Sequence, residues 1–355
     1  MQRWLGAADP GRVHTEGRMA RAALEEAREQ VGALLGARPR EVVFTSGATE
    51  AINTATFGAL EGGGDDGGGV VRTTICAAVE HSAVRDSSSR WGRVVWLPVD
   101  RTGRVDVAAV DDALAREAPG RPALVHCQWA NHEVGTAQPV VEVVERCRAA
   151  GVLVHIDAAA AAGHVPIDFD GLGADLLSVS AHKFGGPPGA GALLVRRGLR
   201  LPPLLVGGEQ ERARRAGLEN VPALTGFGAA AAMVDVVTEA QRAAELIGRA
   251  RAAALAVPGV VELGGPGLPY LLCLSVDGVE AEAVLLGLDQ AGVAAHSGSA
   301  CSSESLEPSP VLEAMGVDAE RSLRVSVGWS TTDADIERFG RVFPDVVARL
   351  RALRA

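Results

Sequence analysis

The chain has 355 residues, enough for two domains that each bury a core. Its 47% hydrophobic and 22% charged residues are typical of a globular protein, and the net charge of −10 disfavours direct binding of nucleic acid. No apolar run approaches the roughly 20 residues of a membrane span, and the N-terminus lacks a signal pattern. We therefore expect a cytoplasmic protein without membrane contact.

Helical and strand-like patterns alternate through the first two thirds of the chain. Apolar residues at helical spacing predict helices over 17–35, after 46–50, over 105–117 and over 140–150. Short apolar runs predict strands over 41–45, 70–76, 94–99, 123–129, 152–156, 176–179 and 191–195. This alternation predicts an α/β fold in which helices flank a mainly parallel sheet.

The last third of the chain follows a charged loop over 207–220 and a long helical stretch over 223–255. We place a domain boundary inside that stretch, near residue 238. It would divide the chain into a large domain, 1–238, and a smaller α+β domain, 239–355. The small domain contains further predicted elements, which are strands over 270–276, 293–296 and 322–327 and helices over 280–292, 308–315 and from 333 onward with a bend at Pro344.

Polar side chains follow several of the predicted strands at the point where each strand ends. Open α/β sheets bind their ligands beyond these carboxyl ends. The residues concerned are Ser46, Thr49, His81, Asn131, Asp157, Ser180 and Lys183. We therefore expect them to face one crevice.

Lys183 is the most informative of these residues. A buried strand over 176–179 leads to Ser180, His182 and Lys183, and a loop rich in glycine and proline follows. A lone lysine is normally a solvated surface charge. This setting suits instead an amine that forms a Schiff base.

The segment Ser46-Gly-Ala-Thr-Glu50 joins a strand to a helix through small residues. Free backbone N–H groups and the helix dipole favour an anion at such a turn, and the hydroxyls of Ser46 and Thr49 add donors. A simple helix cap explains the segment equally well.

Residues 322–327 alternate strictly between apolar and polar side chains. Leu323 and its alternate neighbours would share one face of a strand, and Arg324 would lie between two serines on the other. A guanidinium in this place suits a carboxylate ligand, although a solvent-facing strand with an incidental arginine has the same pattern.

Five cysteines are widely spaced, without the paired spacing of a zinc site, and no metal is expected. Burial explains those in apolar segments, which are Cys76, Cys127, Cys147 and Cys273. Cys301 differs because it lies in a small polar segment, Ser297-Gly-Ser-Ala-Cys-Ser-Ser-Glu-Ser305, with nothing to bury.

Together these features match the needs of pyridoxal phosphate, whose phosphate must be held, whose ring nitrogen pairs with a carboxylate and whose aldehyde binds a lysine. Ser46, Thr49 and Ser180 suit the phosphate, Asp157 the ring nitrogen and Lys183 the aldehyde. His81 would then cover the ring.

The chain resembles the cysteine desulfurases, the NifS/IscS-like branch of the class V, fold-type I pyridoxal-phosphate enzymes. The matching segments run through most of the chain and are Phe44-Thr-Ser-Gly-Ala-Thr-Glu50, Glu80-His81, Asn131 to Gly135, His155-Ile-Asp157, Ser180-Ala-His-Lys183, Gln210-Glu-Arg212, Arg215-Ala-Gly217, Ser297-Gly-Ser-Ala-Cys301, Leu306-Glu-Pro-Ser309 and Ser322-Leu-Arg324.

The resemblance implies a homodimer with a large cofactor domain and a smaller C-terminal domain. It also implies a role for each matching position. Catalysis would use Lys183, Cys301 and His81; the cofactor would contact Ala48, Thr49, His81, Asn131, Asp157, Ser180, His182 and Lys183; and the substrate would contact Asn131 and Arg324.

The implied reaction converts L-cysteine to L-alanine and leaves the sulfur on Cys301 as a persulfide, for delivery to an acceptor such as an iron–sulfur scaffold or a thiolation enzyme. The attacking group must be a thiolate, because a thiol is a poor nucleophile. Two alternatives remain. One is a selenocysteine lyase or another C–S lyase of the same family, and the other is a catalytically weak homologue that serves as a partner protein.

The sequence departs from the family pattern at four places. It starts later than family members usually do, which would remove one edge of the active site. Ala160 replaces a glutamine that bonds the cofactor's phenolic oxygen, and Leu218 replaces a threonine that reaches the other subunit's phosphate. Tyr270 stands where the family has asparagine. Losing one hydrogen bond to a charged oxygen costs roughly 1.5–3 kcal/mol, so we expect weaker cofactor binding.

Overall fold

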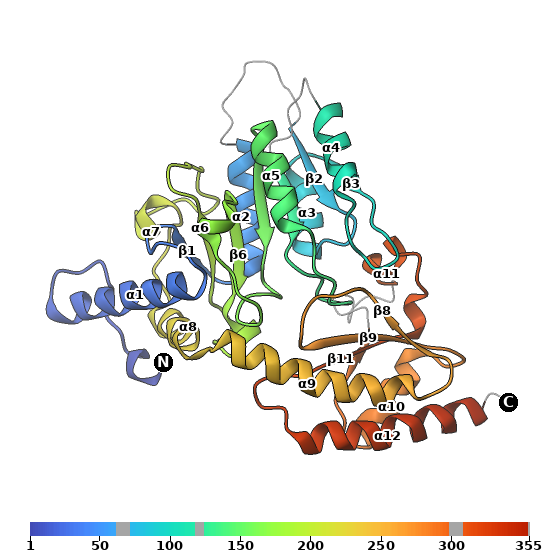
Figure 1. The fold of residues 1–355 in the computed structure, drawn as a ribbon. Coiled ribbons are helices and arrows are strands. Elements are labelled where there is room, and N and C mark those ends of the chain that lie inside the picture. The colour runs from blue at the N-terminus through green and yellow to red at the C-terminus, as the bar shows by residue number, and fades with distance from the viewer. Residues whose placement is uncertain (62–71, 118–123, 298–307, 354–355) are drawn as a thin grey trace. The chain divides into compact units, whose positions relative to one another are not determined.

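The computed structural model describes residues 1–61, 72–117, 124–297 and 308–353 (Figure 1). They form two compact units, and each is considered by itself. The first consists of Met1–Leu97, Val107–Trp129 and Pro139–Asp235, and the second of Pro98–Asp106, Ala130–Gln138 and Val236–Ala355.

The first unit is built on a mainly parallel sheet, as the alternating pattern predicts. Among the described residues its strands lie in the order β1-β7-β6-β5-β4-β2-β3. Only β7 runs antiparallel to its neighbours. Their bounds are β1 (Val42–Thr45), β2 (Thr73–Ala77), β3 (Arg93–Leu97), β4 (Leu124–Gln128), β5 (Leu153–Asp157), β6 (Leu176–Ser180) and β7 (Gly191–Val195).

Helices cover both faces of this sheet. On one face α2 packs against α3, and on the other α4 packs against α5, while α1 packs along α8. The apolar spacing in α1 buries Ala20, Leu24 and Val31. The bounds are α1 (Thr15–Leu34), α2 (Ala48–Glu61), α3 (Ser82–Trp91), α4 (Val107–Arg116), α5 (Val140–Ala150), α6 (Phe169–Leu172), α7 (Gln210–Ala213) and α8 (Val221–Met233).

The second unit contains an antiparallel sheet in the order β10-β11-β9-β8. The predicted alternation over 322–327 is confirmed, because Leu323, Val325 and Val327 all lie in its hydrophobic core, with Phe339 and Phe343. The bounds are β8 (Val260–Leu263), β9 (Leu271–Val276), β10 (His296–Ser297), β11 (Ser322–Ser326), α9 (Val236–Leu255), α10 (Ala281–Gln290), α11 (Pro310–Ala314) and α12 (Asp333–Ala352).

The helical stretch expected over 223–255 is two helices, not one. Helix α8 ends at Met233 because Val234 adopts an extended conformation, and α9 begins at Val236. In the described part of the chain no single helix is long and apolar enough to cross a membrane. The two units divide at this break, whereas the boundary predicted near residue 238 lies inside α9.

Two segments assigned by sequence to the large domain group with the second unit instead, 98–106 and 130–138. Backbone hydrogen bonds explain this grouping. The N–H of Ala137 donates to the carbonyl of Pro266, and the N–H of Leu268 donates to the carbonyl of Gly135. The hydroxyl of Thr136 also donates to the carbonyl of Thr102, which ties the two segments together. A linear reading of hydrophobic patterns cannot reveal such pairing between distant segments.

Candidate active site

The turn between β1 and α2 presents backbone donors, as its sequence suggests. The N–H of Ser46 donates to the Glu50 carboxylate at 2.9 Å, and the N–H of Ala51 donates to the Gly47 carbonyl. The N–H groups of Ala48 and Thr49 lie in the first turn of α2, where backbone N–H groups have no partner within the helix. They and the helix dipole therefore favour an anion here.

The end of β6 lies directly beside this turn. A Cβ atom placed on Gly47 would lie 3.7 Å from the Ser180 hydroxyl, and one on Gly191 would lie 2.6 Å from the Cα of Gly47, so Gly191 must be glycine. The Ser180 hydroxyl forms a 2.9 Å hydrogen bond with Nδ1 of His182. A hydroxyl and an imidazole thus join the backbone donors around one anion-binding corner.

Lys183 lies one turn beyond β6, in a short 3₁₀ helix, η2 (Ala181–Phe184). Every residue of β6 is buried, whereas the Lys183 side chain is exposed. Its backbone carbonyl is held by Nε2 of His164 at 2.9 Å. Burial, and then the charge of Lys183, lower the pKa of His182. Lys183 is also the only lysine in the whole chain.

Asp157 ends the neighbouring strand β5 and is only 7% exposed. Its Oδ1 atom accepts hydrogen bonds from the Ser178 hydroxyl at 3.1 Å and from the Ala159 N–H at 3.0 Å. Among the described residues no donor contacts Oδ2. One oxygen therefore fixes the carboxylate, and the other can pair with a cationic N–H group.

His81 caps the N-terminus of α3. Its Nδ1 accepts the N–H of Ala83 at 3.1 Å, so Nε2 carries the proton in the neutral ring. The turn before it is fixed because the Glu80 carboxylate accepts the N–H of Gln128 at 2.8 Å. Thr49 and His81 line one pocket of about 330 Å³, so these two predicted residues do come together.

Arg324 and Asn131 belong to the second unit. The Arg324 guanidinium donates to the carbonyl of His132 at 2.9 Å, which places it next to the Asn131 turn. Asn131 is fully buried, and its Oδ1 accepts the N–H groups of Glu133 and Val134. The amide oxygen of Asn131 therefore shapes the turn.

Two side chains that were not predicted support the site, whereas one predicted residue lies outside the described part of the chain. Cys301 lies outside the described residues. Ser178 and Gln128 were not singled out from the sequence, although they orient Asp157 and the turn before His81. Ser178 lies two residues before Ser180 on β6, so the strand period was the signal that could have revealed it. Ala160 is buried, and Leu218 is 63% exposed.

The site combines a lysine just beyond β6, a carboxylate at the end of the adjacent strand and a helix N-terminus beside Ser180, all on a mostly parallel sheet. This combination is typical of the fold-type I class of pyridoxal-phosphate enzymes. Residues 2–339 match the family model described as aminotransferase class V. The chain belongs to that family.

Individual relatives indicate which members of the family the chain is similar to in sequence and structure. The chain is 40% identical to a cysteine desulfurase of Nostoc sp., over 97% of this chain and 87% of that protein. It is also 40% identical to an IscS-like cysteine desulfurase of Mycobacterium tuberculosis, over 99% and 92% of the two chains. Among solved structures, SspA in complex with cysteine is similar with a TM-score of 0.78 and 28% identity, over 92% of this chain and 93% of that one.

Proposed function

We propose that the chain is a pyridoxal-phosphate-dependent cysteine desulfurase, which converts L-cysteine to L-alanine and transfers the sulfur to Cys301. The observation that carries the proposal is the position of the single lysine. Lys183 follows β6 beside Ser180 and His182, and Asp157 ends the adjacent parallel strand. The similarity to cysteine desulfurases over nearly the full chain supports the choice of substrate.

The residues of the first unit fit pyridoxal phosphate. The first turn of α2 and the Ser180 hydroxyl suit its phosphate, Oδ2 of Asp157 suits its ring N–H, and the Lys183 amine suits its aldehyde. His81 suits the face of the ring. When bound, the cofactor withdraws electrons from the substrate Cα and so stabilises negative charge there.

The chain's own residues then supply the remaining steps. Arg324 holds the carboxylate of free cysteine, and the Lys183 amine takes the Cα proton. The Cys301 thiolate attacks the substrate sulfur, so that an S–S bond forms and the C–S bond breaks. The electron pair of the C–S bond stays on the carbon skeleton, which takes up protons and leaves as alanine.

The proposal extends to the protein's partners. We infer a homodimer, which the resemblance to the family implies, and the exposed apolar side chains of Val206 and Leu218 suit a contact between subunits. We further infer a sulfur-acceptor protein, such as an iron–sulfur scaffold or a thiolation enzyme, and a cytoplasmic location. Sedimentation of the purified protein tests the dimer, and a purely monomeric species would contradict it.

Replacing Cys301 separates the desulfurase from its nearest rival. In a desulfurase the Cys301→Ser variant should lose alanine formation from L-cysteine, because no thiolate receives the sulfur. Cys147→Ala is the matched control, since Cys147 is fully buried in α5. A Cys301→Ser variant that retains the wild-type rate would favour a selenocysteine lyase or another C–S lyase.

The second rival is a catalytically weak homologue that acts only as a partner protein. Ala160 is the reason to consider it, because it replaces a glutamine that bonds the cofactor in the family. Titration of the apoprotein with pyridoxal phosphate distinguishes it. We expect saturable binding with a visible absorption band that borohydride bleaches. A protein that never acquires this band would support the non-enzymatic role.

A further inference from the structure

An acidic side chain lies at the anion-binding corner, which is formed by the first turn of α2 with Ser180 and His182. Glu50 belongs to this first turn, directly after Thr49, and its carboxylate accepts the N–H of Ser46 at 2.9 Å. A carboxylate here stabilises the helix, because it faces the positive end of the helix dipole. It also repels any anionic ligand that the same helix end attracts. The corner therefore binds an anion tightly only if the charge of Glu50 is offset.

Arg215 offsets this charge. Its guanidinium donates to both oxygens of the Glu50 carboxylate, from Nε at 2.8 Å and from Nη2 at 3.2 Å. Within the part of the chain that the structure describes, no other cationic side chain lies within 4.0 Å of this carboxylate. The side chains of Arg215 and Glu50 are only 22% and 13% exposed, so salt and water screen the pair only in part. Two parallel hydrogen bonds also fix the geometry of the pair.

The pKa directions of the two groups agree with a stable ion pair. Burial alone would raise the pKa of Glu50, but the hydrogen bonds from Arg215 and Ser46 lower it overall. The hydrogen bond to Glu50 raises the pKa of Arg215, although burial opposes this. The Glu50 carboxylate is therefore ionised at neutral pH, and protonation does not remove its charge from the corner.

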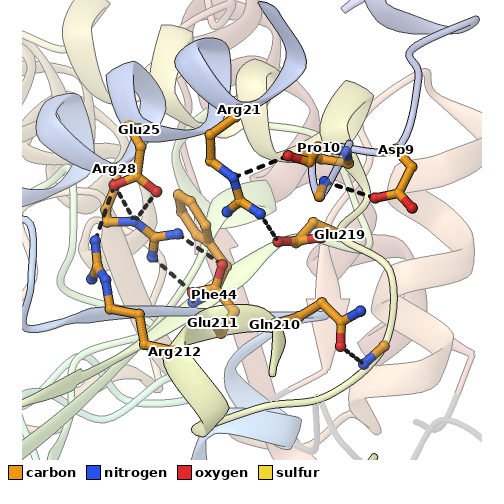
Figure 2. A network of polar contacts seen from close by, with 12 residues as sticks. Asp9, Pro10, Arg21, Glu25, Arg28, Phe44, Gln210, Glu211, Arg212 and Glu219 are labelled. Carbon is orange, nitrogen blue, oxygen red and sulfur yellow. Dashed lines mark hydrogen bonds and ion pairs between the residues drawn. The ribbon is translucent and has the colours of Figure 1, made fainter. Parts of the chain in front are cut away.

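The segment that carries Arg215 also holds the strand that leads into the corner (Figure 2). The Glu211 carboxylate accepts the N–H of Phe44, in β1, at 2.9 Å. Phe44 lies two residues before Ser46, whose N–H is bound by Glu50. Two residues of one segment, Glu211 and Arg215, thus act on backbone N–H groups of the same strand–helix junction. The first does so directly and the second through Glu50.

The backbone of this segment is strained where it turns. Glu211, Arg212 and Ala213 have φ values of 47°, 59° and 60°, in the left-handed region that residues other than glycine rarely adopt. Strain of this kind persists only where the surroundings hold it, and it concentrates at functional sites. Here Arg28 holds it, through two hydrogen bonds to the Glu211 carboxylate at 2.7 and 2.8 Å. The strained turn brings both Glu211 and Arg215 to the junction of β1 and α2.

We propose that Arg215 sets the phosphate affinity of the anion-binding corner through Glu50, without contacting the phosphate itself. The inference rests on the proposed function, because it takes the phosphate of pyridoxal phosphate as the anion. Arg215 cancels the Glu50 charge, which otherwise repels the phosphate. It also keeps the carboxylate on the N–H of Ser46, which preserves the shape of the turn. Arg215 is thus a positioning residue and not a catalytic one.

A comparison of pyridoxal phosphate with pyridoxal isolates this effect, since the two ligands differ only in the phosphate. Each is titrated into the full-length apoprotein and followed by the visible absorption band that appears on binding. The wild type should bind pyridoxal phosphate more tightly. Arg215→Gln should weaken that binding at least about tenfold and leave the binding of pyridoxal unchanged, because pyridoxal carries no phosphate for Glu50 to repel.

A second substitution separates charge from shape. Glu50→Gln removes the charge but keeps the size of the side chain, so the Glu50→Gln/Arg215→Gln double variant leaves no unpaired carboxylate at the corner. It should regain most of the pyridoxal phosphate affinity that Arg215→Gln alone loses. An arginine that touched the phosphate, or one that only held the fold together, would give no such recovery.

Arg146→Gln is the matched control. Arg146 on α5 pairs with Asp111 on α4 at 3.2 Å, and these helices cover the other face of the sheet from α2. This variant should bind both ligands as the wild type does. Glu50→Gln alone provides an independent check, because removal of the repelling charge should leave pyridoxal phosphate bound at least as tightly as in the wild type. Weaker binding by Glu50→Gln counts against the inference.

Three further results would overturn the inference: an Arg215→Gln variant that binds pyridoxal phosphate as the wild type does, an equal loss of pyridoxal binding in that variant, or a double variant that binds no better than Arg215→Gln. In each case the wild type still binds the cofactor, so the proposed function stands. A wild type that binds pyridoxal phosphate no more tightly than pyridoxal would instead contradict both the proposed function and the inference.

Discussion

Lys183 has a predicted chemical role, and it is the only lysine in the sequence. Its setting after a buried strand, beside Ser180 and His182, could be predicted from the chain alone. The orientation of Asp157 could not, because it depends on Ser178 from β6 and on the backbone of Ala159. Side-chain partners that meet across strands leave no local pattern.

The single lysine makes covalent trapping unusually specific. When the protein is loaded with pyridoxal phosphate and reduced with borohydride, the only side chain that can carry the reduced cofactor is Lys183. Mass spectrometry of a digest should therefore find the modification on the peptide that contains Lys183. The Lys183→Ala variant should show none there. Modification confined to the N-terminal amine of the wild type would contradict the assignment.

Two buried histidines, His126 and His155, face each other on adjacent strands with Nδ1 atoms 3.0 Å apart. Burial lowers the pKa of His126 from 6.5 to about 3, and burial together with His126 lowers the pKa of His155 well below 6.5. The sequence marks both as strand residues, but only the fold shows that they form a pair.

This pair should make the protein less stable in acid. Above pH 6.5 the rings are neutral in both the folded and unfolded states; as pH falls towards 3, the unfolded chain binds protons that the folded one excludes. Stability is therefore lost as pH falls through this window, by about 1.4 kcal/mol per pH unit for each proton. Chemical denaturation of His126→Gln between pH 6 and 4 should show a shallower slope than the wild type. Parallel curves would contradict the prediction.

Helix α1, strand β1 and the short helix α7 are joined by the Arg28–Glu211 pair. Both side chains are only 2% exposed, and Arg28 also donates to the carbonyl of Val42 at 2.8 Å. Burial alone would lower the pKa of Arg28, but the hydrogen bonds and charge of Glu211 raise it overall. The helix pattern of α1 could be predicted, whereas a partner 183 residues away could not.

Removing one member of this pair should be more damaging than removing both. Glu211→Gln keeps the side chain's shape but leaves the Arg28 charge buried and unpaired, at a cost of about 3–5 kcal/mol. Arg28→Met combined with Glu211→Leu should recover much of that loss, since no buried charge remains. Urea denaturation of the three proteins measures the difference. A double variant at least as unstable as Glu211→Gln would show that the charge is not the cause.

For the molecule as a whole, the alternation of patterns was sufficient to predict the parallel sheet, since hydrophobic periodicity is a local property. The chain's division into units was harder to predict, because segments 98–106 and 130–138 join the second unit through pairing that no local pattern encodes. The break between α8 and α9 was missed for a related reason. The sequence on both sides of the break has helical spacing, and only Val234 and Asp235 between them are not helical.

Lys183 and Cys301 are proposed to act on one substrate, cysteine. The most direct test is a single turnover, in which cofactor-loaded protein receives less than one equivalent of L-cysteine and is then analysed by mass spectrometry without reductant. We predict one alanine for each cysteine consumed, and a Cys301 peptide heavier by one sulfur atom. Alanine formed without added sulfur on Cys301, or no alanine at all, would contradict the claim.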